Sequence, residues 1–307
     1  MTGSNRAPAA PSGPATTGLA AARSRAIDLL RAPSPLLVVT DFDGTLAPIS
    51  LDPEATAIEP LGRTAIRRLA RLAAARPERL ALVVLSGRLA ADVAGRVRVG
   101  GVRYLGNHGL ESGMLPRSRR AEALQVAADA AFRHWQAPTA AVADAVLAAL
   151  GRPGWLFFEA KGPTVAFHFR QAPDPDVARV AVIEAIEAAE LALGVEGLVQ
   201  VEGRRVVELR PKGAGGKGAA MRRLIEHHRP GGVLVLGDDV SDAEAFAVVR
   251  EARDRGTIAS LAVVVHGAGE TTPAIREAAD LELASPREAA RLLSSVAAGL
   301  EREAAGG

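Results

Sequence analysis

Short apolar runs alternate with longer amphipathic stretches over most of the chain. The run Leu36–Thr40 contains only apolar or β-branched residues, which is typical of a strand buried on both faces of a parallel sheet. Ile66, Leu69 and Leu72 share one helical stripe and predict a helix over about 60–75. Strands that alternate with helices favour right-handed crossovers and an α/β fold with a doubly wound parallel sheet. The other elements predicted for this sheet are strands at 80–85, 102–105, 233–236 and 261–265 and a helix near 241–253.

The middle of the chain follows a different pattern. The elements predicted there are a helix over 121–150, a strand pair at 155–158 and 164–169, a helix over 177–193, and strands near 198–201 and 205–209. This pattern predicts an inserted α+β domain over 114–204, which divides a Rossmann-like core of residues 19–113 and 205–307. Residues 1–18 are mostly Ala, Pro, Gly, Ser and Thr, and we expect them to form a disordered tail.

Two groups of aspartates each follow a predicted core strand directly. Asp41 and Asp43 belong to the run D-F-D-G-T, and Asp238, Asp239 and Asp242 to the run G-D-D-V-S-D. Ligands of open α/β sheets bind at the carboxyl ends of strands, and carboxylates gathered there repel one another unless a cation lies between them. Oxygen donors without cysteine or clustered histidine favour Mg²⁺ over zinc. Helix capping explains one of the later aspartates, but not all three.

Two further segments supply groups that can hold a phosphate. Ser86-Gly87-Arg88 ends the second predicted strand; a hydroxyl and a backbone amide there suit phosphate oxygens, although a helix cap is the simpler interpretation of Ser86 alone. Residues 213–218, G-A-G-G-K-G, match a dinucleotide-binding pattern literally but do not follow a long buried strand. We interpret them as a loop that brings Lys217 to the start of a helix over 218–228. A cation there opposes the helix dipole, which predicts an anionic group nearby.

Composition excludes several classes of protein. The net charge is only +2 and no cysteine is present, which argues against a nucleic-acid partner and excludes zinc–thiolate sites and cysteine nucleophiles. The N-terminus lacks the apolar core of a signal peptide, and no apolar run approaches the ~20 residues that a membrane span requires. We therefore expect a cytoplasmic protein with no membrane partner. Arginine outnumbers lysine heavily, and the lysines are Lys161, Lys212 and Lys217; each is a candidate for a site that needs a compact ammonium group.

In chain order, the motifs D-F-D-G-T, S-G-R, K-G and G-D-D-x-x-D resemble the four motifs of the haloacid dehalogenase superfamily. Further runs are similar to the trehalose-6-phosphate phosphatases, whose cap domain lies between the second and third motifs. These runs are D-F-D-G-T-L-A-P-I at 41–49, G-N-H-G-L-E at 106–111, E-A-K at 159–161, H-F-R at 168–170, and E-L-R-P at 208–211 before K-G at 217–218. The resemblance covers about residues 36–290.

The resemblance implies Mg²⁺-dependent hydrolysis of trehalose 6-phosphate through an aspartyl-phosphate. It makes Asp41 the nucleophile and Asp43 the acid that protonates the departing sugar and then activates water, while Ser86 and Lys217 hold the phosphoryl oxygens. The implied metal-binding residues are Asp41, Asp43 and Asp238, with Asp239 and Asp242 in support. The implied substrate-binding residues are Arg88, Asn107, His108, Glu159, Lys161, His168, Arg170 and Glu208.

Some interpretations stay open at this point. Glu159 and Lys161 can instead form a surface ion pair, and Asn107 and His108 can order their loop instead of lining a pocket. The core motifs determine the reaction and the cap determines the substrate, so another sugar phosphate is an alternative. A non-catalytic phospho-acceptor module is a second alternative, but it needs no acid equivalent to Asp43. The expected partner is a small sugar phosphate, and the resemblance implies a functional link to a trehalose-6-phosphate synthase.

Overall fold

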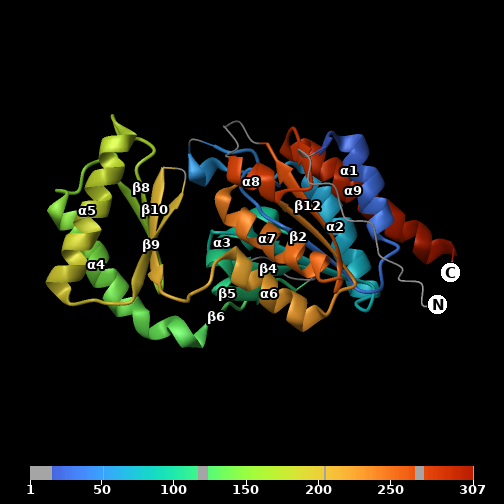
Figure 1. Cartoon of the computed structure of the whole chain (residues 1–307), viewed down its shortest axis with the longest axis horizontal. Coiled ribbons are helices and arrows are strands. Elements are labelled where there is room, and N and C mark those ends of the chain that lie inside the picture. The colour runs from blue at the N-terminus through green and yellow to red at the C-terminus, as the bar shows by residue number, and fades with distance from the viewer. Residues whose placement is uncertain (1–15, 51, 117–123, 204, 267–272, 307) are drawn as a thin grey trace, which may run out of the picture.

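The computed structural model contains two β-sheets, each with helices packed against it (Figure 1). It describes residues 16–50, 52–116, 124–203, 205–266 and 273–306. The larger sheet has nine strands in the order β1-β13-β12-β11-β2-β3-β4-β5-β6, and the smaller has four in the order β7-β8-β10-β9. Within the described residues, no helix combines the length and the apolar character that crossing a membrane demands.

The larger sheet is parallel from β1 to β4, and only β5 and β6 run antiparallel to their neighbours. This confirms the α/β fold with a parallel sheet. Its strands are β1 (Thr16–Thr17), β13 (Leu281–Leu283), β12 (Ala259–Val265), β11 (Gly232–Gly237), β2 (Leu36–Thr40), β3 (Leu80–Leu85), β4 (Arg103–Gly106), β5 (Glu111–Met114) and β6 (Ala127–Ala128).

Both faces of the larger sheet are buried, because alternate side chains of each central strand enter different cores. In β2, Leu36 and Val38 belong to one core, and Leu37 and Val39 belong to the other. The first core is covered by α1 (Leu19–Leu29), α2 (Pro60–Ala75), α3 (Ala90–Val97) and α9 (Pro286–Gly306). The second is covered by α6 (Lys217–His228), α7 (Val240–Asp254) and α8 (Pro273–Ala278).

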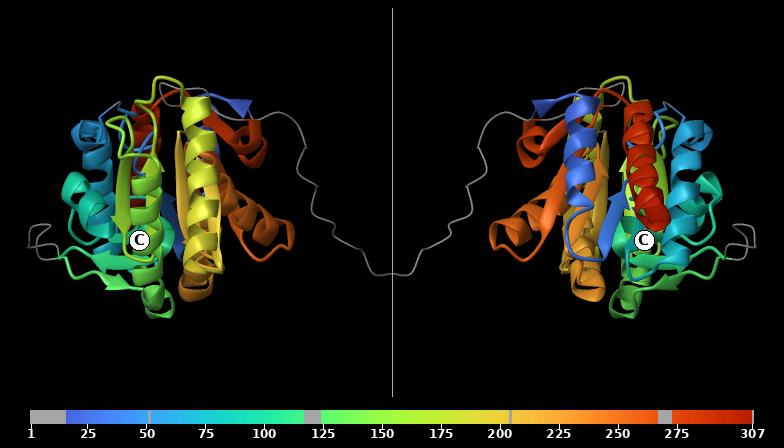
Figure 2. Two further views of the ribbon diagram at one scale, coloured as in Figure 1. Left: turned by 90° about the vertical axis from the view of Figure 1, so that its left-hand side faces the viewer. Right: turned by 90° about the vertical axis from the view of Figure 1, so that its right-hand side faces the viewer.

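The smaller sheet is antiparallel, and both of its helices lie on the same side of it in Figure 1 and stand in front of it in the left view of Figure 2. Val207 and Leu209 of β10 point into a core with the two helices, so Glu208 between them points to the other face, toward the larger sheet. Its strands are β7 (Phe157–Lys161), β8 (Thr164–His168), β10 (Val206–Pro211) and β9 (Leu198–Gly203), and its helices are α4 (Gln136–Ala149) and α5 (Pro175–Leu193). Three short 3₁₀ segments are η1 (Pro53–Ala55), η2 (Asn107–Gly109) and η4 (Ala130–Trp135).

Most predicted elements are present, and α2 has the predicted bounds. The helix predicted over 121–150 is wrong in its first half: residues 117–123 lie outside the described part, 127–128 form β6, and α4 begins only at Gln136. In the predicted disordered tail, Thr16 and Thr17 pair with β13 instead, while residues 1–15 lie outside the described residues. The division into a core and an inserted domain over 114–204 stays a prediction; β6 joins the larger sheet and β10 the smaller.

Candidate active site

Asp41 lies at the carboxyl end of β2, in the middle of the larger sheet. Thr40 pairs with Leu236 of β11 on one side and with Val84 of β3 on the other. The residues that follow these strands therefore emerge at the same edge, as expected for parallel neighbours. The Asp41 N–H donates to the Leu236 carbonyl at 3.0 Å, and the Asp41 side chain is almost completely buried.

Lys217 is the first residue of α6, and its ammonium group reaches the end of β2. Nζ donates to Asp41 Oδ1 at 2.7 Å and to Asp242 Oδ1 at 2.8 Å. Burial alone would lower the pKa of Lys217, but Asp242 and Asp41 outweigh burial and raise it. These carboxylates are the anionic groups that a cation at a helix N-terminus requires. The glycine-rich loop thus delivers Lys217 to the site, as the sequence predicts.

The other aspartates follow β11 and divide into two kinds. Oxygens of Asp41, Asp238 and Asp242 lie within 4.8 Å of one another and could hold a metal ion. Asp239 is instead the N-cap of α7: its side chain accepts from the Val240 N–H at 2.6 Å, in a capping box with Asp242. Asp242 also accepts from the N–H groups of Asp238 and Asp239 at 3.3 Å each, so it orders the loop around the cluster.

The three clustered carboxyls are held where their charged forms are unfavourable. Burial raises the pKa of Asp41 to about 7 despite the opposing effect of Lys217. Burial and the charge of Asp41 raise the pKa of Asp238 well above its ordinary value, and burial also raises the pKa of Asp242. Gly44 lets the chain pass this cluster: its φ is +71°, and a Cβ there would collide with the Asp238 carboxylate. One ammonium does not offset these three carboxylates, of which two are buried and that of Asp238 is half-buried, and a divalent cation would.

Asp43 and Ser86 lie at the same edge of the larger sheet, and both form hydrogen bonds with Arg88. Both Asp43 oxygens accept from Arg88, at 2.7 Å from Nε and 2.8 Å from Nη2, and Arg88 also contacts Asp92 at 3.0 Å. Ser86 is buried, and its Oγ accepts from the Arg88 N–H at 3.1 Å. The structure therefore places Arg88 against Asp43.

The smaller sheet presents a row of paired polar residues to this edge. Lys161 Nζ lies 3.3 Å from Glu159 Oε2 and 4.0 Å from Glu208 Oε2. Glu208 also contacts His108 Nε2 at 3.2 Å, and His168 lies 3.6 Å from Glu159. Burial would raise the pKa of Glu208, but His108, Lys161 and Arg210 lower it to about 2. Lys161 is only 6% exposed, so it does not belong to a surface ion pair.

Four further hydrogen bonds join the smaller sheet and its loops to the loops of the larger one. Asn107 Nδ2 donates to the Lys161 carbonyl, and Asn107 Oδ1 accepts from Thr164 Oγ1, both at 2.9 Å. Lys161 Nζ donates to the Gly87 carbonyl at 2.9 Å, and Arg170 Nη1 to the Ser50 carbonyl at 2.9 Å. The side chain of Asn107 is therefore occupied in holding its loop against the β7–β8 turn.

Sequence reasoning missed three residues that support the site. Asp92 lies four residues after Arg88 on α3, a spacing that already signals an ion pair. Thr164 and Glu244 carried no such signal: Thr164 bonds Asn107 across the two sheets, and Glu244 accepts from the Gly218 N–H at 3.4 Å at the start of α6.

Comparison with known proteins identifies the family. The family model described as trehalose-phosphatase matches residues 39–279, which include every site residue described above. The chain belongs to the trehalose-phosphatase family. The trehalose-phosphate phosphatase of Mycobacterium avium is 38% identical over 280 residues, which cover 86% of this chain and 63% of the relative. That of Mycobacterium tuberculosis is 35% identical over 223 residues, 69% of this chain and 51% of the relative. This trehalose-phosphatase family member thus spans less than two thirds of these relatives' length.

Solved structures agree with the fold. The C-terminal domain of the Candida albicans trehalose-6-phosphate phosphatase has a TM-score of 0.69 at 21% identity and covers 90% of this chain and 96% of that chain. The Aspergillus fumigatus trehalose-6-phosphate phosphatase has a TM-score of 0.60 at 23% identity, with coverage of 90% and 97%. At these identities the likeness shows the fold alone, and it says nothing further about substrate.

Proposed function

We propose that this protein hydrolyses trehalose 6-phosphate to trehalose and phosphate in a Mg²⁺-dependent reaction. The observation that carries the proposal is the buried cluster at the strand ends, where Lys217 bridges Asp41 and Asp242 beside Asp238. Family membership and relatives that bear the name trehalose-phosphate phosphatase support the choice of substrate.

The donor set suits Mg²⁺. Its groups are carboxylate oxygens, which hard divalent cations prefer, and burial raises their pKa values, so that an added cation would favour their charged forms. Asp41, Asp238 and the Asp43 carbonyl would hold the ion, Asp242 would order the loop that carries Asp238, and Asp239 caps α7 beside them. When bound, Mg²⁺ neutralises charge on the phosphoryl oxygens.

In the proposed reaction, an Asp41 carboxylate oxygen attacks phosphorus and forms an aspartyl-phosphate while the bond from phosphorus to the sugar oxygen breaks. Asp43 gives a proton to the departing sugar oxygen. It then takes a proton from water, whose oxygen attacks the same phosphorus; phosphate leaves and Asp41 is regenerated. Lys217 and Ser86 hold the phosphoryl oxygens. Arg88 donates to both Asp43 oxygens and so holds in place the carboxyl group that would move these protons.

The polar face of the smaller sheet is the proposed sugar-binding surface. Glu159 and Glu208 can accept from sugar hydroxyls, and Lys161 can donate to others. His168, Arg170, His108 and Asn107 line or order the same cleft. In this proposal residues 114–204 form a cap that recognises the sugar, together with β10, while residues 19–113 and 205–307 carry out the chemistry. A trehalose-6-phosphate synthase is the proposed source of the substrate.

The test is phosphate release from a panel of esters, with Mg²⁺ and with excess EDTA. The panel contains trehalose 6-phosphate, sucrose 6-phosphate, glucose 6-phosphate and p-nitrophenyl phosphate. We expect the highest kcat/KM for trehalose 6-phosphate, by about 10²-fold over glucose 6-phosphate, because two or more buried sugar contacts are lost with the second ring. A higher kcat/KM for another sugar phosphate would overturn the substrate, and full activity in EDTA would overturn the metal.

A further inference from the structure

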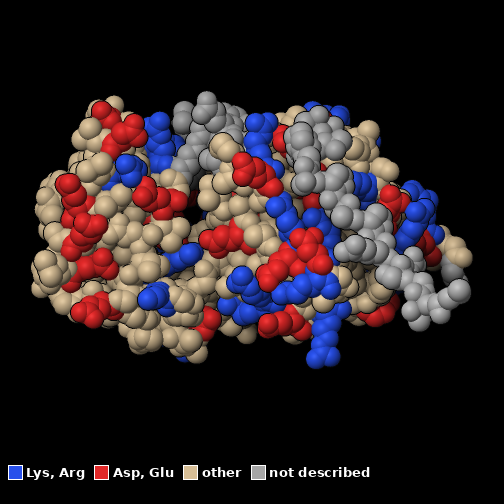
Figure 3. Space-filling view, in the orientation of Figure 1, with Lys and Arg blue, Asp and Glu red and all other residues tan. Residues whose placement is uncertain are grey.

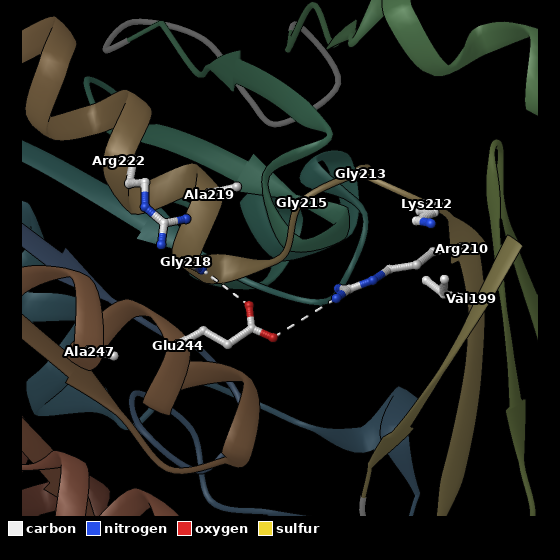
Figure 4. Close-up of a pocket in the computed structure, with 10 residues that line it drawn as sticks. All are labelled: Val199, Arg210, Lys212, Gly213, Gly215, Gly218, Ala219, Arg222, Glu244 and Ala247. Carbon is white, nitrogen blue, oxygen red and sulfur yellow. Dashed lines mark hydrogen bonds and ion pairs between the residues drawn. The ribbon is translucent and has the colours of Figure 1, made fainter. Parts of the chain in front are cut away.

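A cavity of about 450 Å³ lies beside the catalytic cluster but is not lined by it (Figure 4). Its walls come from β9 and β10 of the smaller sheet, from the glycine-rich loop, and from α6 and α7. Asp41, Asp43, Ser86 and Asp238 are absent from its lining. The cavity therefore adjoins the outer side of the loop that ends at Lys217, and the proposed reaction does not use it.

The charged groups of this cavity are three cations and one carboxylate: Arg210, Lys212, Arg222 and Glu244. Glu244 is already engaged, at 3.9 Å from Arg210 Nη2 and 3.4 Å from the Gly218 N–H, as Figure 4 shows. Lys212 and Arg222 form no ion pair with any residue that the structure describes. Basic side chains stand on both sides of the hollow between the two sheets in Figure 3. The cavity thus keeps an excess of positive charge.

The backbone around the cavity also suits an anion. Gly213, Gly215 and Gly216 have φ values of +81°, +93° and +132°, so this loop offers peptide groups without side chains. At Gly216 a Cβ would collide with the Glu244 carboxylate, so the loop can lie this close only as glycine. Gly218 and Ala219, in the first turn of α6, complete the wall, and the helix dipole adds positive potential there.

One of the three lysines of the chain also lies at this cavity. Lys161 and Lys217 are each almost fully buried in ion pairs of the catalytic site. Lys212, the remaining lysine of an arginine-rich chain, is exposed and lines the cavity. Two of the three lysines thus pair with carboxylates of the catalytic site. The third lines a cavity whose one carboxylate, Glu244, already pairs with Arg210.

From these observations we infer that the cavity is a second anion-binding site, which takes a phosphate-bearing small molecule through Lys212, Arg222 and the glycine loop. Its lining contains no aromatic side chain, so it offers no stacking surface for a nucleotide base. A neutral sugar would leave both cations without a counter-charge. Because the loop leads directly into Lys217, an anion bound here contacts the segment that positions the catalytic ammonium group.

The experiment is isothermal titration calorimetry on the full chain in excess EDTA, where the carboxylate cluster lacks its metal and repels anions. The probes are inorganic phosphate, glucose 6-phosphate and, as a neutral sugar, trehalose. We expect one equivalent of phosphate or of glucose 6-phosphate to bind. Lys212→Ala and Arg222→Ala should each raise Kd about tenfold, the loss that one charge-assisted hydrogen bond accounts for. Comparison of the two phosphates decides whether free phosphate or a phosphate ester is preferred.

Arg67→Ala is the matched control. Arg67 is an exposed arginine on α2, far from the cavity lining, and its removal changes the net charge equally. It should leave Kd unchanged. The inference is overturned if neither phosphate binds, if the cavity variants bind as the wild type does, or if Arg67→Ala weakens binding as much as they do. Trehalose binding that Lys212→Ala removes would show a sugar subsite instead. The experiment measures binding without metal, so its result does not depend on whether the proposed hydrolysis is correct.

Discussion

The larger and the smaller sheet each carry a group of carboxylates, and the electrostatic settings of the two groups are opposite. At the ends of β2 and β11, burial raises the pKa values of Asp41, Asp238 and Asp242. On the smaller sheet, histidine and lysine partners outweigh burial and lower the pKa values of Glu159 and Glu208. An added cation would therefore favour the charged forms of the first group. The carboxylates of the second group are already paired with cationic side chains of the chain itself.

This difference indicates what each side can receive. A cluster that is short of positive charge gains most from an added cation, and that cation brings a phosphoryl group with it. Carboxylates that are already paired keep their charge and orientation, and they can accept hydrogen bonds from neutral hydroxyls without a further cation. The larger sheet is thus suited to the reacting phosphate and the smaller to an uncharged polyol.

The largest effect should come from the nucleophile. Asp41→Asn removes the attacking oxygen's charge, and turnover of any ester should fall at least ~10³-fold, or about 4 kcal/mol of barrier. Lys217 retains Asp242 as a partner, and the loss of one buried carboxylate relieves repulsion, so the thermal midpoint should not fall. Phosphate release and thermal unfolding check both statements. Near-normal turnover in the folded variant would exclude Asp41 as the nucleophile.

The next effect concerns the metal side of the comparison. Asp238→Ala should reduce turnover by about 10²-fold at the Mg²⁺ concentration that saturates the wild type, and added Mg²⁺ should restore part of it. Asp239→Ala is the control from the same loop, because its carboxylate caps α7 instead; it should lower stability by ~1 kcal/mol with little change in the Mg²⁺ requirement. Titrations of activity with Mg²⁺ compare the variants, and an unchanged curve for Asp238→Ala would contradict the assignment.

A third effect tests the paired side through stability. The pKa of Glu208 is about 2 in the folded chain against an ordinary value of 4.5, so its charge stabilises the fold at pH above 4.5. That contribution, about 3 kcal/mol at most, is lost as pH falls from 4.5 toward 2. Glu208→Gln should therefore be less stable than the wild type at pH 7, and the difference should shrink below pH 4.5. Urea unfolding at both pH values measures it, and a difference independent of pH would refute the pairing.

The sequence predicts the central strands of the larger sheet better than its edge strand β6. Doubly buried strands such as β2 are continuous apolar runs, and α2 has a clear stripe that begins at a proline, so pattern alone defines them. Residues 121–150 are rich in alanine, which favours a helix throughout, but β6 at 127–128 pairs with β5 and the helix begins later. Pairing of this kind depends on tertiary contacts that local propensity does not contain.

Positions in the site were predictable where a motif fixes a residue at the end of a strand or at the start of a helix. Asp41 follows its strand directly and Lys217 begins its helix, and the two side chains meet at one sheet edge although they are 176 residues apart. The Arg88–Asp43 pair and the Glu244–Gly218 contact depend on side-chain directions that no motif or spacing signals. Asp239 illustrates a third case: an aspartate in a metal-like motif also matches a helix cap, and only its hydrogen bond to Val240 shows which role its side chain takes here.

The smallest effect should separate the two sides most sharply. Among the described residues, the ion-pair partners of Glu159 are Lys161 and His168, both on the smaller sheet, whereas Lys161 also donates to Gly87 beside Ser86. Glu159→Gln is therefore a cleaner probe of sugar recognition than a change at Lys161.

If Glu159 accepts from a sugar hydroxyl, Glu159→Gln should lower kcat/KM for trehalose 6-phosphate by about tenfold, because one charge-assisted hydrogen bond is weakened. Hydrolysis of p-nitrophenyl phosphate, which has no sugar, should stay the same. Lys217→Ala should reduce both activities, since both substrates share the phosphoryl group. Glu202→Gln is the matched control and should change neither activity, because Glu202 of β9 forms an exposed ion pair with Arg179 of α5. Equal losses on both substrates for Glu159→Gln would mean that the smaller sheet supports the reacting groups, and the division between the two carboxylate groups would fail.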